Sequence, residues 1–352
     1  MEQLNQWLED IHGLDEKSME AARRHQDRLT KPRGSLGRLE ELAIRIAGIT
    51  GELHPQLSKK RIVLFAADHG VAREGVSAYP REVTGQMVLN FLKGGAAINA
   101  ISRAAGAEVE VVDIGVDADF LETQGLVNRK IARGSANIAE GPAMTVEQAL
   151  SAIAVGVDRA DAAVQEGVKI LGTGDMGIGN TTPSSALYAV LLNRPAGEVT
   201  GRGTGLDDKG LAWKVHVVER VRAVNRARLT DPLSILAALG GFEIAGLCGL
   251  IIGAAQRRIP VVIDGFISSA AALVAIRMKS EIKHYCIFGH LSQERGHQLF
   301  FQEMGERPLL DLELRLGEGT GAALAMGIIQ AAMAAHNRMA TFESAGVSDQ
   351  EG

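Results

Sequence analysis

A glycine-rich segment at residues 172–182 has the composition of a phosphate-binding loop, and it directly follows the apolar run Val168–Leu171. Its glycines permit left-handed backbone angles and leave main-chain N–H groups uncovered by side chains. Asn180, Thr181 and Thr182 add polar side chains at a point where a helix could begin, and the first N–H groups of a helix attract anions. The segment therefore predicts a turn that holds a phosphorylated ligand.

Glu318 is the candidate for catalytic chemistry. It lies in the third of three glycine clusters, at residues 317–321; the second is at residues 201–205, and together the clusters indicate a ligand held from several sides. A glycine on each side lets the carboxylate project into a cavity, and the nearby Leu314 and Leu316 would raise its pKa toward that of a general base. By residue type alone, an acid that only stabilises a helix N-terminus would be the commoner case.

Asp264 and four histidines are the other polar residues weighed for chemistry. Asp264 ends an apolar run before a glycine, where an acid is as often a turn or helix cap as a ligand-binding group, so both interpretations stay open. Asp68–His69, His284, His290 and His297 fit no compact zinc-binding spacing. We therefore expect no metal and no cofactor.

Residues 172–177 also match the G-x-G-x-x-G fingerprint of dinucleotide-binding proteins. That fingerprint requires an acidic residue at the end of a second strand about 20 residues later. Here a helical pattern at residues 187–192 runs into residues 193–198 with no second strand ahead of it. A dinucleotide-dependent oxidoreductase and a purely structural turn are therefore the weaker alternatives.

The elements that would position these residues alternate between short β-rich runs and longer Ala- and Leu-rich helical patterns. This alternation predicts an α/β fold with a Rossmann-like, mostly parallel sheet and helices on both faces. Ligands of such sheets bind beyond the carboxyl ends of the strands, where the candidate residues fall. The predicted strands are Ile62–Ala66, Val109–Asp113, Val168–Leu171, Pro260–Ile263 and Tyr285–Phe288.

The two ends of the 352-residue chain have a helical pattern. We expect residues 1–57 and 322–352 to form a small helical domain and residues 58–321 to form the large α/β domain. The net charge of −5 gives no electrostatic footprint for nucleic acid or an anionic membrane. A polar N-terminus, the lack of a membrane-spanning run and two cysteines in apolar runs (Cys248 and Cys286) predict a cytoplasmic protein.

Five motifs together resemble one family, the nicotinate-nucleotide–dimethylbenzimidazole phosphoribosyltransferases of cobalamin lower-ligand synthesis. The resemblance extends from about residue 30 to about residue 330, and the motifs, weak singly, are highly specific in combination and order. They are Thr30–Glu40 (TKPRGSLGRLE), Ala67–Val71 (ADHGV), Gly174–Thr182 (GDMGIGNTT), Asp264–Ser268 (DGFIS) and Leu316–Ala323 (LGEGTGAA). One position departs from the family pattern, because Asp175 stands where the family usually has the longer glutamate.

The resemblance implies transfer of the 5-phosphoribosyl group from nicotinate mononucleotide to 5,6-dimethylbenzimidazole, giving α-ribazole 5′-phosphate and nicotinate, in a homodimer. Glu318 matches the family's catalytic base. Tyr79, Gln86 and Leu316 would line the pocket of the aromatic base, with Asp264 as a further possible contact. The residues implied to hold phosphate and ribose are Asp175, Gly177, Gly179, Asn180, Thr181, Thr182, Gly203 and Lys214. A non-catalytic nucleotide-binding protein on the same fold is the other alternative, and it would have no need of an acid on a glycine hinge.

Overall fold

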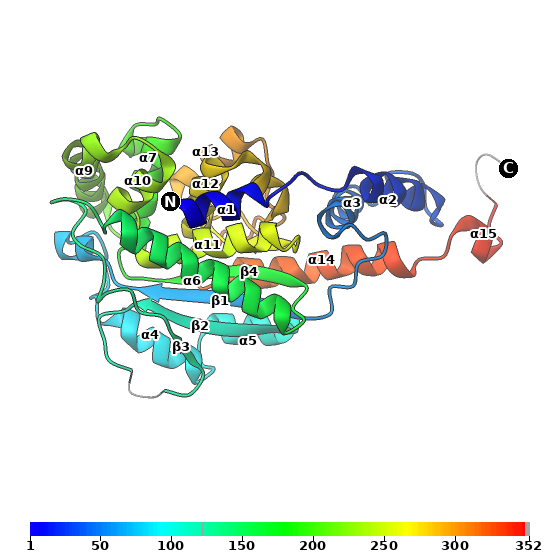
Figure 1. The fold of residues 1–352 in the computed structure, drawn as a ribbon, viewed down its shortest axis with the longest axis horizontal. Coiled ribbons are helices and arrows are strands. Elements are labelled where there is room, and N and C mark those ends of the chain that lie inside the picture. The colour runs from blue at the N-terminus through cyan, green and yellow to red at the C-terminus, as the bar shows by residue number, and fades with distance from the viewer. Residues whose placement is uncertain (121–122, 349–352) are drawn as a thin grey trace.

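Six parallel strands form the central sheet of the computed structural model, which describes residues 1–120 and 123–348 (Figure 1). The strands are β1 (Lys60–Ala67), β2 (Ala107–Gly115), β3 (Leu126–Asn128), β4 (Ile170–Met176), β5 (Val261–Ile263) and β6 (Cys286–Phe288). They lie in the order β3-β2-β1-β4-β5-β6, and each neighbouring pair is parallel. This is the doubly wound order in which the topology switches direction between β1 and β4. The predicted fold class is confirmed.

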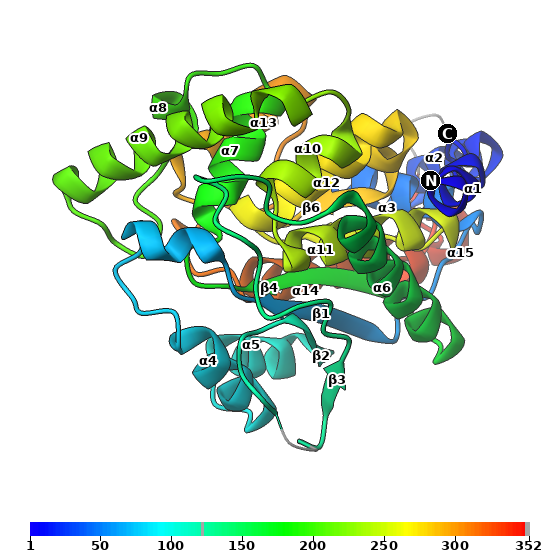
Figure 2. The same ribbon diagram turned by 60° about the vertical axis from the view of Figure 1, so that its left-hand side comes forward.

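Side chains of the central strand β1 alternate between two apolar cores, one on each face of the sheet. Val63 and Phe65 belong to the larger core, and Ile62 and Leu64 belong to the smaller one. The larger core includes residues of α1 (Glu2–Glu9), α6 (Val146–Gln165), α7 (Thr181–Leu191), α10 (Pro232–Leu239), α11 (Phe242–Gln256) and α12 (Phe266–Met278). The smaller core includes residues of α3 (Arg38–Thr50), α4 (Val83–Leu92), α5 (Ala97–Ala105) and α14 (Thr320–Arg338) (Figures 1 and 2).

Of the remaining helices, α8 (Ala196–Val199), α9 (Asp208–Asn225) and α13 (Arg295–Met304) also add buried residues to the larger core. The helices α2 (Glu16–Arg28) and α15 (Phe342–Ala345) lie near the chain ends, and short 3₁₀ helices lie at Gly70–Glu74, Arg226–Arg228 and Ser280–Tyr285. None of the helices in the described part of the chain is long and apolar enough to cross a membrane.

The helices α2 and α3 lie beside the C-terminal end of α14, at the end of the molecule that also holds α15 (Figure 1). The main-chain N–H of Thr30 donates to the carbonyl of Ala340, 3.0 Å away, which ties the two chain ends together. The first half of α14 packs on the sheet instead, since Ala322 and Met326 belong to the smaller core. The division into residues 1–57 with 322–352 and residues 58–321 stays a prediction.

The strand β4 continues through the first half of the glycine-rich segment, so the prediction of a turn from Gly172 onward was wrong. The reason is close packing. A Cβ on Gly172 would lie 2.3 Å from Cδ1 of Ile62, and one on Gly174 would lie 2.7 Å from the carbonyl oxygen of Glu318. These two glycines let a neighbouring strand and the Glu318 loop approach β4. The turn itself begins only at Gly177, after the strand ends.

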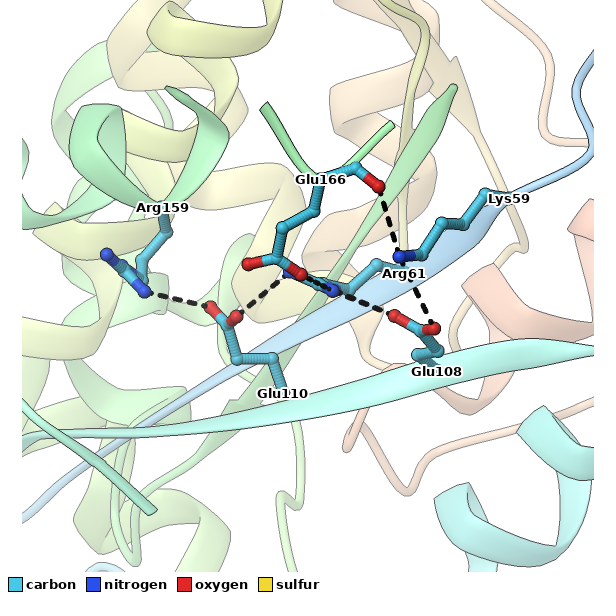
Figure 3. Close-up of polar contacts among 6 residues, drawn as sticks. All are labelled: Lys59, Arg61, Glu108, Glu110, Arg159 and Glu166. Atoms are coloured by element: carbon cyan, nitrogen blue, oxygen red, sulfur yellow. Dashed lines mark hydrogen bonds and ion pairs between the residues drawn. The ribbon is translucent and has the colours of Figure 1, made fainter. Parts of the chain in front are cut away.

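Charged side chains surround Arg61 at the amino-terminal end of β1 (Figure 3). The Arg61 guanidinium is buried and pairs with carboxylates from three places: Glu108 at 2.8 Å, Glu110 at 3.2 Å, and Glu166 just after α6. Arg159 lies 3.8 Å from Glu110 on its other side. Burial raises the pKa of Glu110, whereas the hydrogen bond from Arg61 lowers the pKa of Glu166. This network closes the end of the sheet opposite to the candidate residues.

Candidate active site

A cavity of about 350 Å³ lies at the carboxyl ends of β4, β5 and β6. Its walls come from the residues after these strands and from the loops at residues 203–204 and 315–318. This is the edge of a parallel sheet where ligands are expected to bind. The predicted site residues that line the cavity are Tyr79, Asp175, Gly177, Asn180, Thr181, Gly203, Asp264, Leu316 and Glu318.

The N-terminus of α7 forms the anion-attracting part of the wall. Asn180 is the N-cap residue and Thr181 the first residue of the helix, and both line the cavity. Gly179 makes the turn with a left-handed φ of 92° and packs against Ala72. Thr182 is fully buried inside the helix start. The first N–H groups of a helix have no acceptor within it and carry the positive end of its dipole, so this wall suits a phosphate group.

Lys214 lies directly behind that wall. It is fully buried on α9, and its Nζ donates to Oγ1 of Thr181, 2.6 Å away. Burial lowers the pKa of Lys214 to about 8, although the charge of Glu294 opposes this shift. Gly203 has a left-handed φ of 54°, and a Cβ on it would lie 2.9 Å from the Lys214 Nζ, so the loop passes close to the ammonium group. Within the described residues Lys214 forms no ion pair, which leaves its charge to act on an anion beside Thr181.

Glu318 occupies a strained turn just before the N-terminus of α14. Its φ is 62°, between Gly317 at 82° and Gly319 at 94°. A left-handed angle is uncommon outside glycine, and such residues cluster at functional sites. The main-chain N–H of Ile98, in the first turn of α5, donates to Oε2 of Glu318 over 3.1 Å. Burial raises the pKa of Glu318, the bond from Ile98 lowers it, and the charge of Asp264 raises it.

Asp264, and not Glu318, accepts the hydrogen bonds from the N-terminus of α14. Its Oδ1 accepts from the N–H of Ala322 at 2.9 Å, and its Oδ2 accepts from the N–H of Gly319 at 3.3 Å. Burial raises the pKa of Asp264, while the charge of His290 and the α14 N–H groups lower it. The sequence left open whether Asp264 is a cap or a ligand-binding group. The structure shows a cap that also lines the cavity.

Asp175 is the third buried carboxyl group of the cavity. Nδ2 of Asn180 donates to its Oδ2 over 3.0 Å, and a Cβ on Gly317 would lie 3.3 Å from the same oxygen. Burial raises the pKa of Asp175 well above its ordinary value, and the charge of Asp264 raises it further. Asp175 therefore lies between the turn before α7 and the loop that carries Glu318, despite having a shorter side chain than the family pattern.

Apolar side chains from α4 complete the wall next to the predicted base-binding residues. Val83 and Met87 line the cavity together with Tyr79 and Leu316, whose side chains are at the rim and are 55% and 56% exposed. Gln86, on the same helix, lines a neighbouring pocket and not this cavity. The expected rise in the Glu318 pKa is present, but the exposed Leu316 does not form a closed cover over the carboxylate.

Comparison with known proteins shows the family to which this chain belongs. A family model described as "Phosphoribosyltransferase" matches residues 11–347. The chain belongs to this phosphoribosyltransferase family. The nicotinate-nucleotide–dimethylbenzimidazole phosphoribosyltransferase of Chlorobaculum parvum is 55% identical over 347 residues, covering 99% of this chain and 98% of its own. The enzyme of that name from Chloroflexus aggregans is 55% identical over 351 residues, which cover 100% of this chain and 99% of its own.

Solved structures agree with the sequence comparison. The crystal structure of CobT from Thermus thermophilus matches with a TM-score of 0.90 at 46% identity, covering 94% of this chain and 99% of that one. The family resemblance inferred from the five motifs is confirmed, and this chain is a phosphoribosyltransferase enzyme. The oxidoreductase and the non-catalytic binder receive no support.

Two polar residues of this phosphoribosyltransferase cavity were missed or set aside by sequence reasoning. His290 was weighed only as a metal ligand, yet it lines the cavity, is 1% exposed and lies 3.9 Å from Oδ1 of Asp264. Neither of its ring nitrogens has a hydrogen-bond partner among the described residues. Glu294, which accepts from the N–H of Gly203 at 2.8 Å, was not considered. His290 follows the predicted strand Tyr285–Phe288, at the edge of the sheet where ligands are expected, but the sequence alone assigns it no role. No local pattern marks Glu294, because its contact with Gly203 joins loops far apart in the sequence.

Proposed function

We propose that this phosphoribosyltransferase moves the 5-phosphoribosyl group from nicotinate mononucleotide to 5,6-dimethylbenzimidazole, giving α-ribazole 5′-phosphate and nicotinate. The observation that carries the proposal is the presence of a buried, strained carboxylate and an anion-attracting helix start in one cavity. The curated relatives that carry this enzyme name match nearly the whole chain at about 55% identity, which supports the same substrates here.

The phosphate of the donor would bind at the N-terminus of α7. The main-chain N–H groups of Ile178, Asn180 and Thr182 already donate within the protein, so the Thr181 hydroxyl and the other N–H groups of the turn from Gly177 would hold the phosphate. Lys214 strengthens this site through its 2.6 Å bond to the Thr181 hydroxyl. Asn180, which is held to Asp175, would position the adjoining ribose. The backbone of Gly203, close to Lys214, closes the same end of the cavity.

Glu318 would act as the general base. A ring nitrogen of the benzimidazole donates its lone pair to C1′ of the ribose, and the C1′–nitrogen bond to the nicotinate ring breaks with its electrons going to that ring. Positive charge then builds on the imidazole portion of the acceptor, and Glu318 takes the proton from its other nitrogen. Partial burial, by raising the carboxyl pKa, brings it closer to that of an effective base. The donor's pyridinium is already a good leaving group, so no metal or cofactor is needed to activate it.

Tyr79 and Leu316 at the rim would contact the aromatic base, and Asp264 would fix the Glu318 loop beside it. Gln86 would reach the base only from the neighbouring pocket. The exposed apolar surface of Tyr79 and Leu316 also supports a homodimer in which a second subunit covers the rim.

Two buried free cysteines, Cys248 and Cys286, fit a reducing, cytoplasmic environment.

The direct test is an assay of purified protein with nicotinate mononucleotide and dimethylbenzimidazole. Nicotinate and α-ribazole 5′-phosphate should appear in equal amounts, as resolved by chromatography. Release of nicotinate without the base would indicate a hydrolase, and no release with any of several benzimidazoles would reject the proposal.

A further inference from the structure

Three histidine side chains meet at the end of the molecule away from the cavity. His25 lies on α2, His54 follows α3, and His336 lies in the last turn of α14. Their ring centroids are 4.7 Å, 4.8 Å and 5.6 Å apart, and one nitrogen of each ring lies within 4.8 Å of the others. His336 lies 282 residues after His54, which itself lies 29 residues after His25, so no local sequence pattern reveals the group.

Hydrogen bonds to carbonyl oxygens orient two of these rings. Nε2 of His336 donates to the carbonyl of Leu53, and Nε2 of His25 donates to the carbonyl of His336, both over 2.8 Å. A neutral imidazole that donates from Nε2 keeps its lone pair at Nδ1. Metal-binding histidines almost always make such a bond, because it fixes the ring and increases the basicity of the other nitrogen.

Gln26 adds an unused acceptor beside the rings. Its side chain is 3% exposed, and its Nε2 donates to Nδ1 of His336 over 2.8 Å. The Oε1 of the same amide is buried and has no hydrogen-bond partner among the described residues. Buried polar atoms are normally satisfied, and each exception calls for an explanation. A 180° rotation of the Gln26 side-chain amide would exchange Nε2 and Oε1 and present the oxygen to an ion bound at His336 Nδ1.

We propose that His25, His54 and His336 bind a divalent transition-metal ion such as Zn²⁺, with Gln26 Oε1 or a water in the fourth position. Imidazole nitrogen is a preferred ligand for Zn²⁺, whereas Mg²⁺ and Ca²⁺ prefer oxygen. Zn–N bonds of about 2.0–2.1 Å in a tetrahedral site place ligand nitrogens roughly 3.3 Å apart, so the rings need to close by about 1.5 Å at most. The exposed side chain of His54 on its loop can make that movement.

Such an ion would join three parts of the fold without entering the reaction. It would tie α2 and the segment around His54 to the end of α14, whose first turn begins two residues after Glu318. The site therefore acts on stability. It departs from the sequence-based expectation of no metal, which rested on the spacing of other histidines, and it is independent of the proposed substrates.

The test uses the full-length chain without a histidine tag, first stripped with a chelator. Calorimetric titration with Zn²⁺ should give one ion per chain, the thermal midpoint should rise by a few degrees, and Mg²⁺ should do neither. X-ray absorption at the zinc edge should report nitrogen ligands at about 2.0 Å. Stripped protein that binds no Zn²⁺, or binds it without a thermal shift, would overturn the proposal.

His54→Ala is the decisive variant, because this exposed ring makes no hydrogen bond to the described residues that its loss would break. It should weaken Zn²⁺ binding by at least about 100-fold, the upper end of the losses seen on altering outer-shell partners. His12→Ala, which removes another exposed histidine near the N-terminus, should bind as the unaltered chain does. Equal binding by the His54 and His12 variants would reject the site. Nicotinate release in the presence of chelator should be the same in both, which separates failure of this proposal from failure of the proposed function.

Discussion

Replacing Glu318 by glutamine tests the proposed base with little disturbance of the fold. The amide has the same shape as the carboxylate, and its oxygen can still accept the 3.1 Å bond from the Ile98 N–H. It cannot take a proton from the attacking base. Loss of acid–base catalysis costs roughly 10²–10⁴ in kcat, which corresponds to about 3–5 kcal/mol in the barrier. The KM values for both substrates should change little, since binding contacts remain.

The structure also predicts the sign of the stability change. Burial raises the folded-state pKa of Glu318 above its unfolded value, so the ionised carboxylate disfavours folding at pH values above that unfolded pKa. Removing the charge should therefore leave the unfolding midpoint at pH 7 unchanged or slightly higher. If Glu318 served only to hold the first turn of α5, glutamine would reduce stability by a fraction of a kcal/mol and leave kcat intact.

The assay is steady-state nicotinate release over a range of pH. The unaltered enzyme should lose kcat as the pH falls through the raised pKa of Glu318, and the glutamine variant should lack this acidic limb. Glu313→Gln is the matched control, because Glu313 is an exposed glutamate nearby that also has a left-handed φ, 57°. It should behave as the unaltered enzyme does. A Glu318→Gln enzyme with nearly normal kcat would refute the reasoning.

The remaining predictions concern the phosphate end, metals and the Arg61 network. Lys214→Met should raise the KM for nicotinate mononucleotide by about 10–100-fold, as expected for losing a charged hydrogen-bond donor, and should affect the KM for the base far less; equal effects would count against the assignment. Chelator should leave turnover unchanged, and loss that one divalent ion restores would contradict the metal-free reaction. Arg61→Met should lower the free energy of unfolding by about 3 kcal/mol in urea titrations, because Glu110 stays buried, while kcat is retained. Arg24→Met, on the exposed surface, should change stability little, and a similar loss there would contradict the role of burial.

The strands that could be predicted from sequence were those buried on both faces. Helices cover both faces of the sheet at β1, so residues 62–66 form a continuous apolar stretch. The strand was therefore identified within two residues at each end. β3 was missed because its three residues lie at the sheet edge and include the exposed Asn128. The end of β4 was misplaced because glycine normally weakens a strand, and only the close approach of Ile62 and the Glu318 loop explains glycine there.

Much of the candidate site could be predicted because its residues lie in short motifs after strands. Asp175, Asn180 and Glu318 reach the same cavity from such motifs. Lys214 was inferred only through resemblance, and its relation to Thr181 depends on how α9 packs against the start of α7. The role of Asp264 was undecidable from sequence, since only the tertiary structure brings it to the N-terminus of α14.

The distribution of charge in the cavity provides a physical reason for its fit to the proposed donor. The phosphate end has the α7 N-terminus and Lys214, with Glu294 close by; Asp264 and Glu318 lie at the α14 end, and Asp175 lies between the two. Nicotinate mononucleotide has the matching pattern, with a negative phosphate and a positive pyridinium ring. As the glycosidic bond breaks, positive charge moves through the ribose to the attacking base, and it stays beside the carboxyl groups throughout. Both oxygens of Asp264 accept hydrogen bonds from the start of α14, whereas Asp175 and Glu318 each have one oxygen engaged, by Asn180 and Ile98. The left-handed turn between two glycines then distinguishes Glu318 as the proposed base.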